Sequence, residues 1–161
     1  MKSKVRKIFT KLQIYFSEKK YKQYLKDSGI LIGENFIIRG NHRTVHIDLS
    51  RPSLISIGDN VTINSNFTIF THDFVSGVFL NKYGDFLPSS GRVKIGNNVR
   101  FGVNCTILKN VYIGDNCFIA AGSVVVKDIP ANSIAGGVPA KVIGKRENAL
   151  EYELDYHPKY R

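Results

Sequence analysis

The amino-acid sequence predicts an all-β fold, a parallel β-helix of six-residue repeats with an amphipathic helix before it. Aliphatic residues recur every six positions between residues 32 and 130, Gly-Asp-Asn corners punctuate the run, and helical periodicity is missing there. A doubly wound α/β sheet, the main competitor, needs helices of about ten or more residues between its strands. We therefore divide the chain into an N-terminal helix (1–29), a β-helix domain (30–146) and a C-terminal tail (147–161).

Composition limits the classes of protein to consider. The chain has 161 residues, 43% hydrophobic and 22% charged, so one globular domain with a core is expected. No apolar run approaches about 18 residues and no signal-peptide pattern opens the chain, which favours a cytoplasmic location. Cys105 and Cys117 fit neither a disulfide framework nor a zinc pattern, and we interpret both as small core residues.

The first segment is strongly basic. Residues 1–30 hold nine Lys or Arg and two acidic residues, which supplies +7 of the net charge of +10. Between Val5 and Phe16 apolar residues recur at the three-and-four spacing of an amphipathic helix, and Ser28-Gly29 is its expected end. We expect this helix to cap the stack of coils, with contact to an anionic membrane surface as an additional use. A site for single-stranded nucleic acid combines basic residues with aromatic side chains on strands, on which the bases stack. The basic residues here cluster on one predicted helix without such aromatic residues, which disfavours nucleic-acid binding.

The six-residue period is most regular in the downstream half of the chain. Two interlocked series carry it: Ile95, Phe101, Ile107, Ile113, Ile119 and Val125, with Val99, Cys105, Val111, Cys117, Ser123 and Ile129 four residues after each. The same pattern occurs upstream at Ile57, Ile63 and Ile69, after a weaker start at Ile32 and Ile38. Three repeats form one triangular coil, and stacked coils bury aliphatic columns that no single repeat could bury.

The corners between repeats share a composition. Three phrases repeat it: Gly58-Asp59-Asn60, Gly96-Asn97-Asn98 and Gly114-Asp115-Asn116. Glycine accepts backbone angles denied to other residues, and Asp or Asn tolerates the left-handed region and forms hydrogen bonds in turns. We therefore expect each phrase to form a sharp corner, with the glycine supplying unusual angles.

The downstream motifs resemble the hexapeptide-repeat acyltransferases, and within them the maltose, galactoside and polysaccharide O-acetyltransferases. The resemblance covers roughly residues 55–145 and rests on the repeat phrases, on Lys127-Asp128-Ile129-Pro130 and on Ala135–Ile143. Known members are left-handed β-helices that form trimers and bind acetyl-CoA between subunits. The resemblance therefore implies a left-handed β-helix. This is an exception to the general rule that the connections between parallel strands are right-handed.

A histidine stands where the repeat is interrupted. His72 is followed by residues 75–92, rich in Gly, Ser and Pro, which we interpret as a loop excluded from the coils. By resemblance His72 matches the catalytic base of the family, and the loop resembles an extension that covers a neighbouring subunit's active site. A neutral imidazole suits proton removal from a hydroxyl near neutral pH. His42, His46 and His157 are interpreted as structural.

The same register implies residues that bind the cofactor and the acceptor. Small residues allow an extended ligand to approach the backbone, and cations suit the phosphates of CoA. The implied cofactor-binding residues are Gly102, Val103, Ala121, Val126, Lys127, Lys141 and Lys145. The Gly102-Val103 corner is also the candidate backbone donor for the oxyanion. The residues assigned to the acceptor are Asp73, Tyr83 and Asn41, and no metal ligand is assigned.

The group that orients His72 stays open at this point. Asp73 is adjacent in the chain, but neighbouring residues on a strand point to opposite faces, so direct contact between the two is not expected. A main-chain carbonyl and Asn41 are the alternatives.

The resemblance predicts a homotrimeric, acetyl-CoA-dependent O-acetyltransferase that acts on a sugar hydroxyl in surface polysaccharide or glycan biosynthesis, by direct transfer with His72 as base. A second hypothesis keeps the chemistry but has an antibiotic or amino-sugar acceptor. A third is a non-catalytic scaffold similar to relatives of the γ-class carbonic anhydrases. Those carry three metal-ligand histidines, whereas His72 stands alone within the regular repeats, so a zinc site is not predicted.

Overall fold

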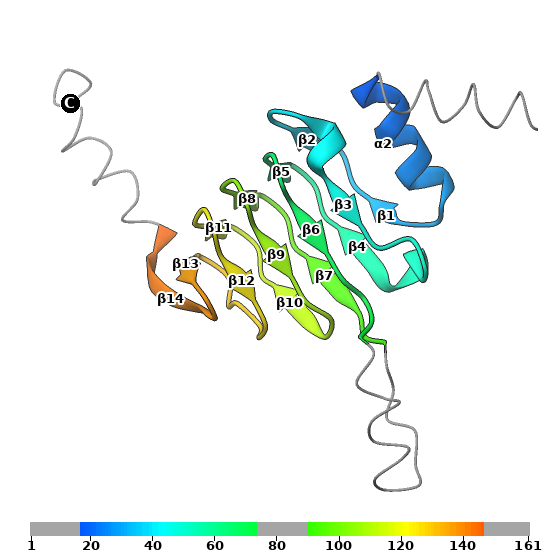
Figure 1. Ribbon diagram of the computed structural model, residues 1–161. Coiled ribbons are helices and arrows are strands. Elements are labelled where there is room, and N and C mark those ends of the chain that lie inside the picture. The colour runs from blue at the N-terminus through cyan, green and yellow to red at the C-terminus, as the bar shows by residue number, and fades with distance from the viewer. Residues whose placement is uncertain (1–16, 74–89, 147–161) are drawn as a thin grey trace, which may run out of the picture.

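The computed structural model describes residues 17–73 and 90–146, in which short strands wind into a three-sided solenoid (Figure 1). The helix and the strands, in chain order, are α2 (Glu18–Asp27), β1 (Leu31–Ile32), β2 (Ile37–Ile38), β3 (His46–Ile47), β4 (Ile55–Ile57), β5 (Thr62–Ile63), β6 (Thr68–Ile69), β7 (Val93–Ile95), β8 (Arg100–Phe101), β9 (Thr106–Ile107), β10 (Val111–Ile113), β11 (Phe118–Ile119), β12 (Val124–Val125), β13 (Ser133–Gly137) and β14 (Ala140–Lys145). Two 3-10 turns, His42–Thr44 and Pro52–Leu54, widen the first coil.

Three sheets form the three faces of the solenoid. Sheet A has the strand order β1-β4-β7-β10, sheet B has β14-β13-β11-β8-β5-β2, and sheet C has β12-β9-β6-β3. Because successive strands join sheets A, B and C in turn, each full coil gives one strand to every face. β13 and β14 are antiparallel, while the other strand pairs of the described residues are parallel. The architecture is the predicted left-handed parallel β-helix, and its weak start corresponds to β1 and β2.

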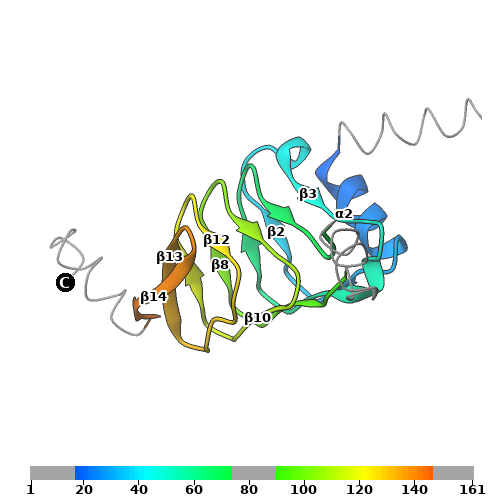
Figure 2. The same cartoon turned by 60° about the horizontal axis from the view of Figure 1, so that its bottom comes forward.

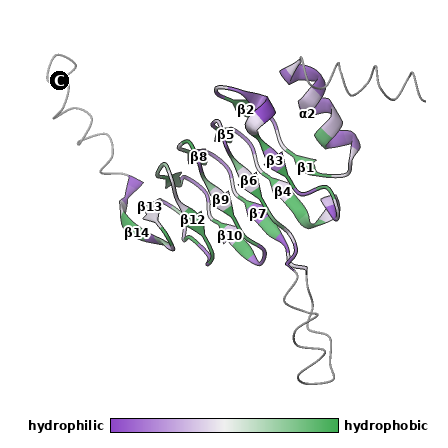
Figure 3. Cartoon of the chain, viewed as in Figure 1, coloured by the Kyte–Doolittle hydropathy of each residue, from purple (hydrophilic) through white to green (hydrophobic). Residues whose placement is uncertain are grey.

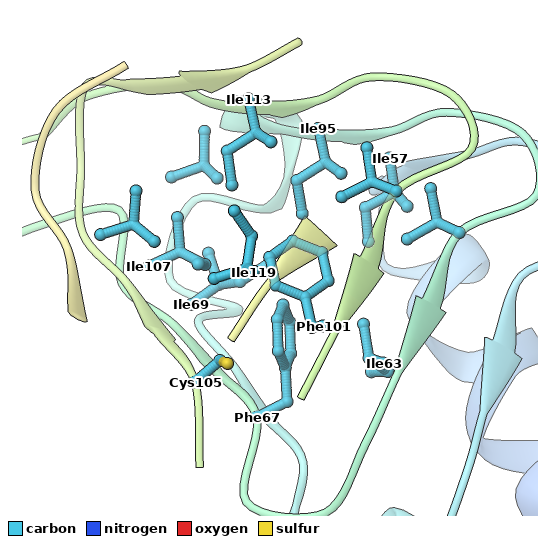
Figure 4. Close-up of a cluster of buried hydrophobic side chains, with 14 of the residues drawn as sticks. Ile57, Ile63, Phe67, Ile69, Ile95, Phe101, Cys105, Ile107, Ile113 and Ile119 are labelled. Carbon is cyan, nitrogen blue, oxygen red and sulfur yellow. The ribbon is translucent and has the colours of Figure 1, made fainter. Parts of the chain in front are cut away.

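The core is a stack of aliphatic side chains from all three sheets (Figure 4). Equivalent residues of successive coils lie opposite each other, as Ile57 lies opposite Ile95 and Ile69 opposite Ile107. The repeat residues are buried: Ile57, Ile63, Ile69, Ile95, Phe101, Ile107, Ile113, Ile119 and Val125. Burying one such side chain stabilises the fold by about 1.5–3 kcal/mol. The six-residue period therefore follows from the need to place one such side chain on each face of each coil.

Both cysteines belong to this core, as predicted. Cys105 and Cys117 are free thiols and fully buried, and burial raises the pKa of both. Figure 4 shows Cys105 beside Phe67, whose ring meets that of Phe101 edge-on with 4.9 Å between the ring centroids. Buried thiols with a raised pKa are poor nucleophiles, so their role is packing.

The corners differ from the prediction in which residue takes the unusual backbone angles. The left-handed region is occupied by asparagines, with φ of +56° at Asn60, Asn98 and Asn116, whereas Gly58 has no positive φ. A Cβ atom at Gly58 would lie 2.7 Å from backbone atoms of Gly96 in the next coil. The expectation that these glycines supply special angles is therefore wrong. Glycine is required there because the coils approach too closely for any side chain.

Side chains at the same corners join one coil to the next. The Asn98 amide donates to Asn116, and the Asn116 amide donates to Asn132, each at 3.1 Å. Beside this ladder, the Asp115 carboxylate accepts a hydrogen bond of 2.7 Å from the backbone N–H of Asn97. Asparagine suits the position because it tolerates the left-handed region and its amide both donates and accepts.

Helix α2 closes one end of the stack, and β14 lies at the other (Figures 1 and 2). Ser17 has extended angles and its hydroxyl accepts from the N–H of Lys20, so α2 begins at Glu18; residues 1–16 lie outside the described residues. The helix ends at the predicted Ser28-Gly29, where φ of Gly29 is +100°. Leu25 is fully buried in the core, so α2 covers the end of the stack. Within the described residues, no helix has the length and apolar character needed to cross a bilayer.

Substitutions at Asn116 test the corner. Asn116→Ala removes both ladder hydrogen bonds, each worth about 0.5–1 kcal/mol, and places alanine in the left-handed region at a cost of about 1 kcal/mol or more. We expect the free energy of unfolding to fall by about 2–3 kcal/mol. Asn116→Gly loses the same hydrogen bonds without the strain, so its loss should be about 1 kcal/mol smaller. Urea denaturation at a fixed protein concentration measures both, and equal losses would contradict a strained corner.

Candidate active site

His72 lies where the chain leaves sheet C, directly after β6. Its backbone pairs with Ser90 in an antiparallel bridge, so residues 18 positions apart in the chain lie side by side here. The loop predicted at residues 75–92 falls mostly on residues 74–89, which, with the predicted acceptor residue Tyr83, lie outside the described residues. The His72 side chain is 31% exposed, which leaves it accessible to a substrate.

Asp48 is the side chain that holds His72. Its Oδ2 atom lies 2.6 Å from Nδ1 of the imidazole. Asp48 follows β3, one coil before the histidine, and Ile47 of β3 pairs in register with Ile69 of β6. Residues 24 positions apart therefore meet at one edge of the solenoid because two coils stack.

The Asp48 carboxylate is surrounded by donors. Its Oδ2 accepts from the backbone N–H of Thr71 at 3.0 Å and from the Thr71 hydroxyl at 2.5 Å. Its Oδ1 accepts from the N–H of Ser50 at 2.9 Å and from the Ser50 hydroxyl at 2.7 Å. Burial by itself raises the pKa of Asp48, but the hydrogen bonds from Thr71, Ser50 and His72 outweigh it and hold that pKa well below the usual range. Asp48 is therefore ionised at neutral pH, with 7% of its side chain exposed.

The ionised carboxylate decides which imidazole nitrogen can act as a base. A carboxylate accepts hydrogen bonds and donates none, so Nδ1 of His72 carries the proton toward Asp48. The lone pair of the neutral ring is then on Nε2. The Ser50 hydroxyl also lies 3.3 Å from Nδ1, so both neighbours contact the same side of the ring. The pair can remove a proton from a hydroxyl group while Asp48 stabilises the imidazolium that forms.

A shallow groove of about 250 Å³ runs along the outer face of sheet C to His72. It is lined by His46, Thr68 and Phe70 from the strands and corner, and by Tyr21 from α2. The Tyr21 hydroxyl donates to the carbonyl of Val45 at 3.0 Å, and burial, with a smaller effect of Tyr24, raises the pKa of Tyr21 to about 12. The groove therefore offers the polar side chains of Thr68 and His46 and the exposed aromatic ring of Phe70 beside the histidine, with the Asp48 carboxylate in its lining.

Asp73 does not orient His72, as expected from strand geometry. Its carboxylate instead pairs with the ammonium of Lys109 in the next coil, with 2.7 Å between Oδ2 and Nζ. Asp73 lies beside the histidine in the chain, and Lys109 follows β9 at the same edge of the solenoid. The acceptor role predicted for Asp73 thus concerns a carboxylate that is already paired with a cation.

The residues predicted to bind acetyl-CoA divide between two edges of the solenoid. Those after β8 and β11, where the chain passes from sheet B to sheet C, are Gly102, Val103 and Ala121. Those after β12, where it passes from sheet C to sheet A, are Val126 and Lys127. His72 lies on the second edge, two coils from Val126. Within one chain, therefore, Val126 and Lys127 share an edge with His72, whereas Gly102, Val103 and Ala121 do not.

The remaining predicted residues lie on β14 and in the first coil. Lys141 and Lys145 are on β14, at the end opposite α2. Asn41, considered above as an orienting group, caps the 3-10 turn after β2 and accepts from the N–H of Arg43 at 3.1 Å. His42 packs against the Tyr21 ring, with 5.8 Å between centroids.

Gly102 is excluded as the donor to an oxyanion. Its N–H donates to the carbonyl of Ile119 at 2.8 Å as part of the contact between coils. A Cβ atom at this position would lie 2.5 Å from the backbone nitrogen of Ala121, so the glycine has a packing reason as well. At this corner the N–H of Val103 is the remaining candidate.

The sequence did not predict the contact between Asp48 and His72 because the first coil is irregular. The two 3-10 turns lengthen its corners, so Ile47 lies opposite Ile69, 22 residues later, whereas a regular coil such as that from Ile107 to Val125 takes 18. A count of regular coils therefore does not bring Asp48 near His72. One feature of the sequence could have indicated this contact: Asp48 directly follows Ile47, a buried aliphatic residue of the coil before the histidine. Among residues 17–73 and 90–146, no group of three or more His, Cys, Asp or Glu side chains could hold a metal ion.

Comparisons of sequence agree with the repeat and with the acetyl-transfer family. The family model described as "Bacterial transferase hexapeptide (six repeats)" matches residues 92–127. The galactoside O-acetyltransferase of Escherichia coli (strain K12) is 42% identical over 116 residues, which cover 72% of this chain and 54% of that protein. The chain spans about half the length of the curated relatives it matches.

Solved structures extend the likeness to most of the chain. A hexapeptide-repeat acetyltransferase from Vibrio cholerae, solved in complex with acetyl-coenzyme A, shares the fold with a TM-score of 0.61 at 24% identity, over 84% of this chain and 82% of that one. A maltose O-acetyltransferase from Clostridium difficile 630 is 30% identical with a TM-score of 0.59, and the match covers 86% of this chain and 83% of that chain. With this coverage, and with the repeat matched by the family model, the chain belongs to the hexapeptide-repeat acetyltransferase family.

Proposed function

We propose that this protein is an acetyl-CoA-dependent O-acetyltransferase that acetylates a hydroxyl of a sugar, with His72 as general base and Asp48 as the residue that positions it. The observation that carries the proposal is the 2.6 Å contact between the buried Asp48 carboxylate and Nδ1 of an accessible histidine. Galactoside and maltose O-acetyltransferases among the relatives support a sugar acceptor. Surface polysaccharide or another glycan is the proposed source of that sugar.

The transfer needs one proton to move from the acceptor hydroxyl to His72 and then from His72 to the CoA sulfur. Nε2 of His72 takes the proton of the acceptor hydroxyl as the oxygen attacks the thioester carbonyl of acetyl-CoA. The tetrahedral intermediate then breaks its C–S bond, the acetyl group stays on the acceptor oxygen, and the CoA sulfur receives the proton from His72. Asp48 stays ionised throughout, because its pKa is held well below the usual range, and it stabilises the imidazolium between the two transfers.

The active unit in this proposal is a homotrimer with the cofactor between subunits. Within one chain, the predicted cofactor residues Gly102, Val103 and Ala121 lie on a different edge from His72. A neighbouring copy related by threefold symmetry can present that edge to the histidine, since identical subunits expose both edges. Val126 and Lys127, on the same edge as His72, and Lys141 and Lys145 on β14 complete the proposed contacts.

Substitution of His72 tests the general base. Removing it should lower kcat/KM by at least about 10², the usual contribution of general-base catalysis, while acetyl-CoA still binds. Release of free CoA thiol from acetyl-CoA, with a panel of sugars and nucleotide sugars, gives the rate and the acceptor together. A folded His72→Ala variant with undiminished turnover would contradict the assignment, and acetyl-CoA binding by neither protein would favour a non-catalytic scaffold.

Substitutions of Asp48, which contacts His72, and of Asp73, which pairs with Lys109, test the positioning role of Asp48. Asp48→Asn keeps the size of the side chain but loses the charge that fixes the proton on Nδ1, so we expect kcat to fall by about tenfold or more with little change in KM. Asp73→Asn is the matched control, because that carboxylate pairs with Lys109 instead. Steady-state kinetics should show a larger loss of kcat at position 48 than at position 73; the reverse order would assign the positioning role to Asp73.

Mixed trimers test whether two chains form one site. His72→Ala leaves the B-to-C edge intact, and Ala121→Trp blocks that edge at an exposed position while leaving His72 intact. Each variant alone should be inactive, but co-expressed subunits should recover about a quarter of the sites, because random mixing pairs an intact histidine with an intact edge at that frequency. If both halves of the site belonged to one chain, no mixture would recover activity.

A further inference from the structure

Positive charge is concentrated in the N-terminal third of the sequence. Residues 1–54 contain 12 of the 23 Lys and Arg residues but only 4 of the 13 Asp and Glu residues, which gives +8 of the net charge of +10. The described part of this segment comprises α2 and the first coil, which form one end of the stack (Figure 1). Within residues 17–54, this end of the stack holds seven Lys or Arg and four Asp or Glu.

Helix α2 turns its lysines away from the core. Leu25 and Tyr21 pack inward, while Lys19, Lys20 and Lys26 are exposed, and Figure 3 shows the helix as mostly hydrophilic. Only Lys22 of α2 forms an ion pair in the part of the chain that the structure describes, with Glu18 at 2.6 Å. The three exposed ammonium groups are thus available to an external anionic surface.

Exposed apolar side chains occur on the same end of the stack. Tyr24 on α2 is 40% exposed, and Leu31, which opens β1 four residues after the helix, is 68% exposed. Exposed lysines, an exposed tyrosine and an exposed leucine at one end of the molecule match the chemistry of a lipid headgroup region, where charge meets phosphate and apolar groups enter the boundary with the acyl chains. Phosphate groups of a nucleic acid would satisfy the lysines but would leave Leu31 without an apolar partner.

We propose that α2 and the adjoining first coil dock on a bilayer that contains anionic lipid. Tyr21 of the same helix lines the groove that leads to His72, so docking would hold the mouth of that groove beside the membrane surface. The docking does not depend on the transfer reaction, because none of Lys19, Lys20, Lys26 and Leu31 belongs to the proposed catalytic or cofactor-binding residues. It would favour acceptors that are anchored in the membrane over acceptors in solution.

Vesicle binding by the full chain tests the proposal. We expect sedimentation with vesicles of phosphatidylcholine containing about 30% phosphatidylglycerol, little with phosphatidylcholine alone, and loss of binding as the salt concentration rises from roughly 0.05 to 0.5 M. Lys20→Gln combined with Lys26→Gln should weaken partitioning about 20- to 30-fold, since each lysine near such a surface contributes about fivefold. Arg92→Gln combined with Lys94→Gln, which removes the same charge from the start of the third coil, should change it less than about threefold.

The outcomes that overturn the proposal are distinct. Equal weakening by the two double variants would show a response to net charge alone, and equal binding to both kinds of vesicle would remove the electrostatic basis. Tighter, salt-sensitive binding to a DNA or RNA oligonucleotide than to the anionic vesicles would assign the surface to nucleic acid. Circular dichroism of each variant verifies that the fold is retained.

A fluorescent reporter tests whether Leu31 enters the lipid. The chain contains no tryptophan, so Leu31→Trp introduces a single emitter at an exposed site, and Tyr112→Trp on β10 is the matched control at another exposed position. With anionic vesicles, the emission of the first variant should shift to shorter wavelength and be quenched by brominated acyl chains, while the second should not change. The same emission from both variants would contradict docking through the N-terminal end.

Discussion

Each coil of this protein rests on the next through backbone hydrogen bonds between parallel strands, and the approach is so close that the corners accept no side chain at certain positions. Gly58 shows the constraint directly, since a Cβ atom there would overlap with the backbone of Gly96. Once the coils are stacked at this spacing, equivalent residues lie opposite each other and the aliphatic columns form without further adjustment. The asparagine ladder at the corners holds the same register from the outside.

The proposed catalytic pair, Asp48 and His72, depends on that register. Asp48 and His72 come from successive coils, and neither residue has a local sequence reason to be near the other. The Thr71 backbone and hydroxyl fix the carboxylate from the second coil, while Ser50 fixes it from the first. The same stacking that buries the core thus brings a desolvated, ionised carboxylate against Nδ1 of the imidazole, and Nε2 is the proposed base.

The solenoid also separates functions along its length and around its edges. Around its edges, the corner with His72 and the corner with Gly102 and Val103 are on different sides of the prism, which is why the proposed site requires a second copy of the chain. Along its length, the basic helix occupies one end and β14 the other. A rigid stack therefore keeps the proposed membrane-facing surface and the proposed cofactor contacts of β14 apart.

The sequence by itself determined the repeat, the buried columns, the core role of the two cysteines, the end of the helix at Ser28-Gly29 and the place of His72 at the break in the pattern. These features are local or periodic, because burial on each face of each coil repeats every six residues. The tertiary structure alone decided that Asp48 holds His72, that Asp73 pairs with Lys109 and that the corner glycines serve close approach while asparagines take the left-handed angles. Those features depend on the offset between coils, and the two 3-10 turns make the offset from the first coil to the second longer than the 18 residues of a regular coil.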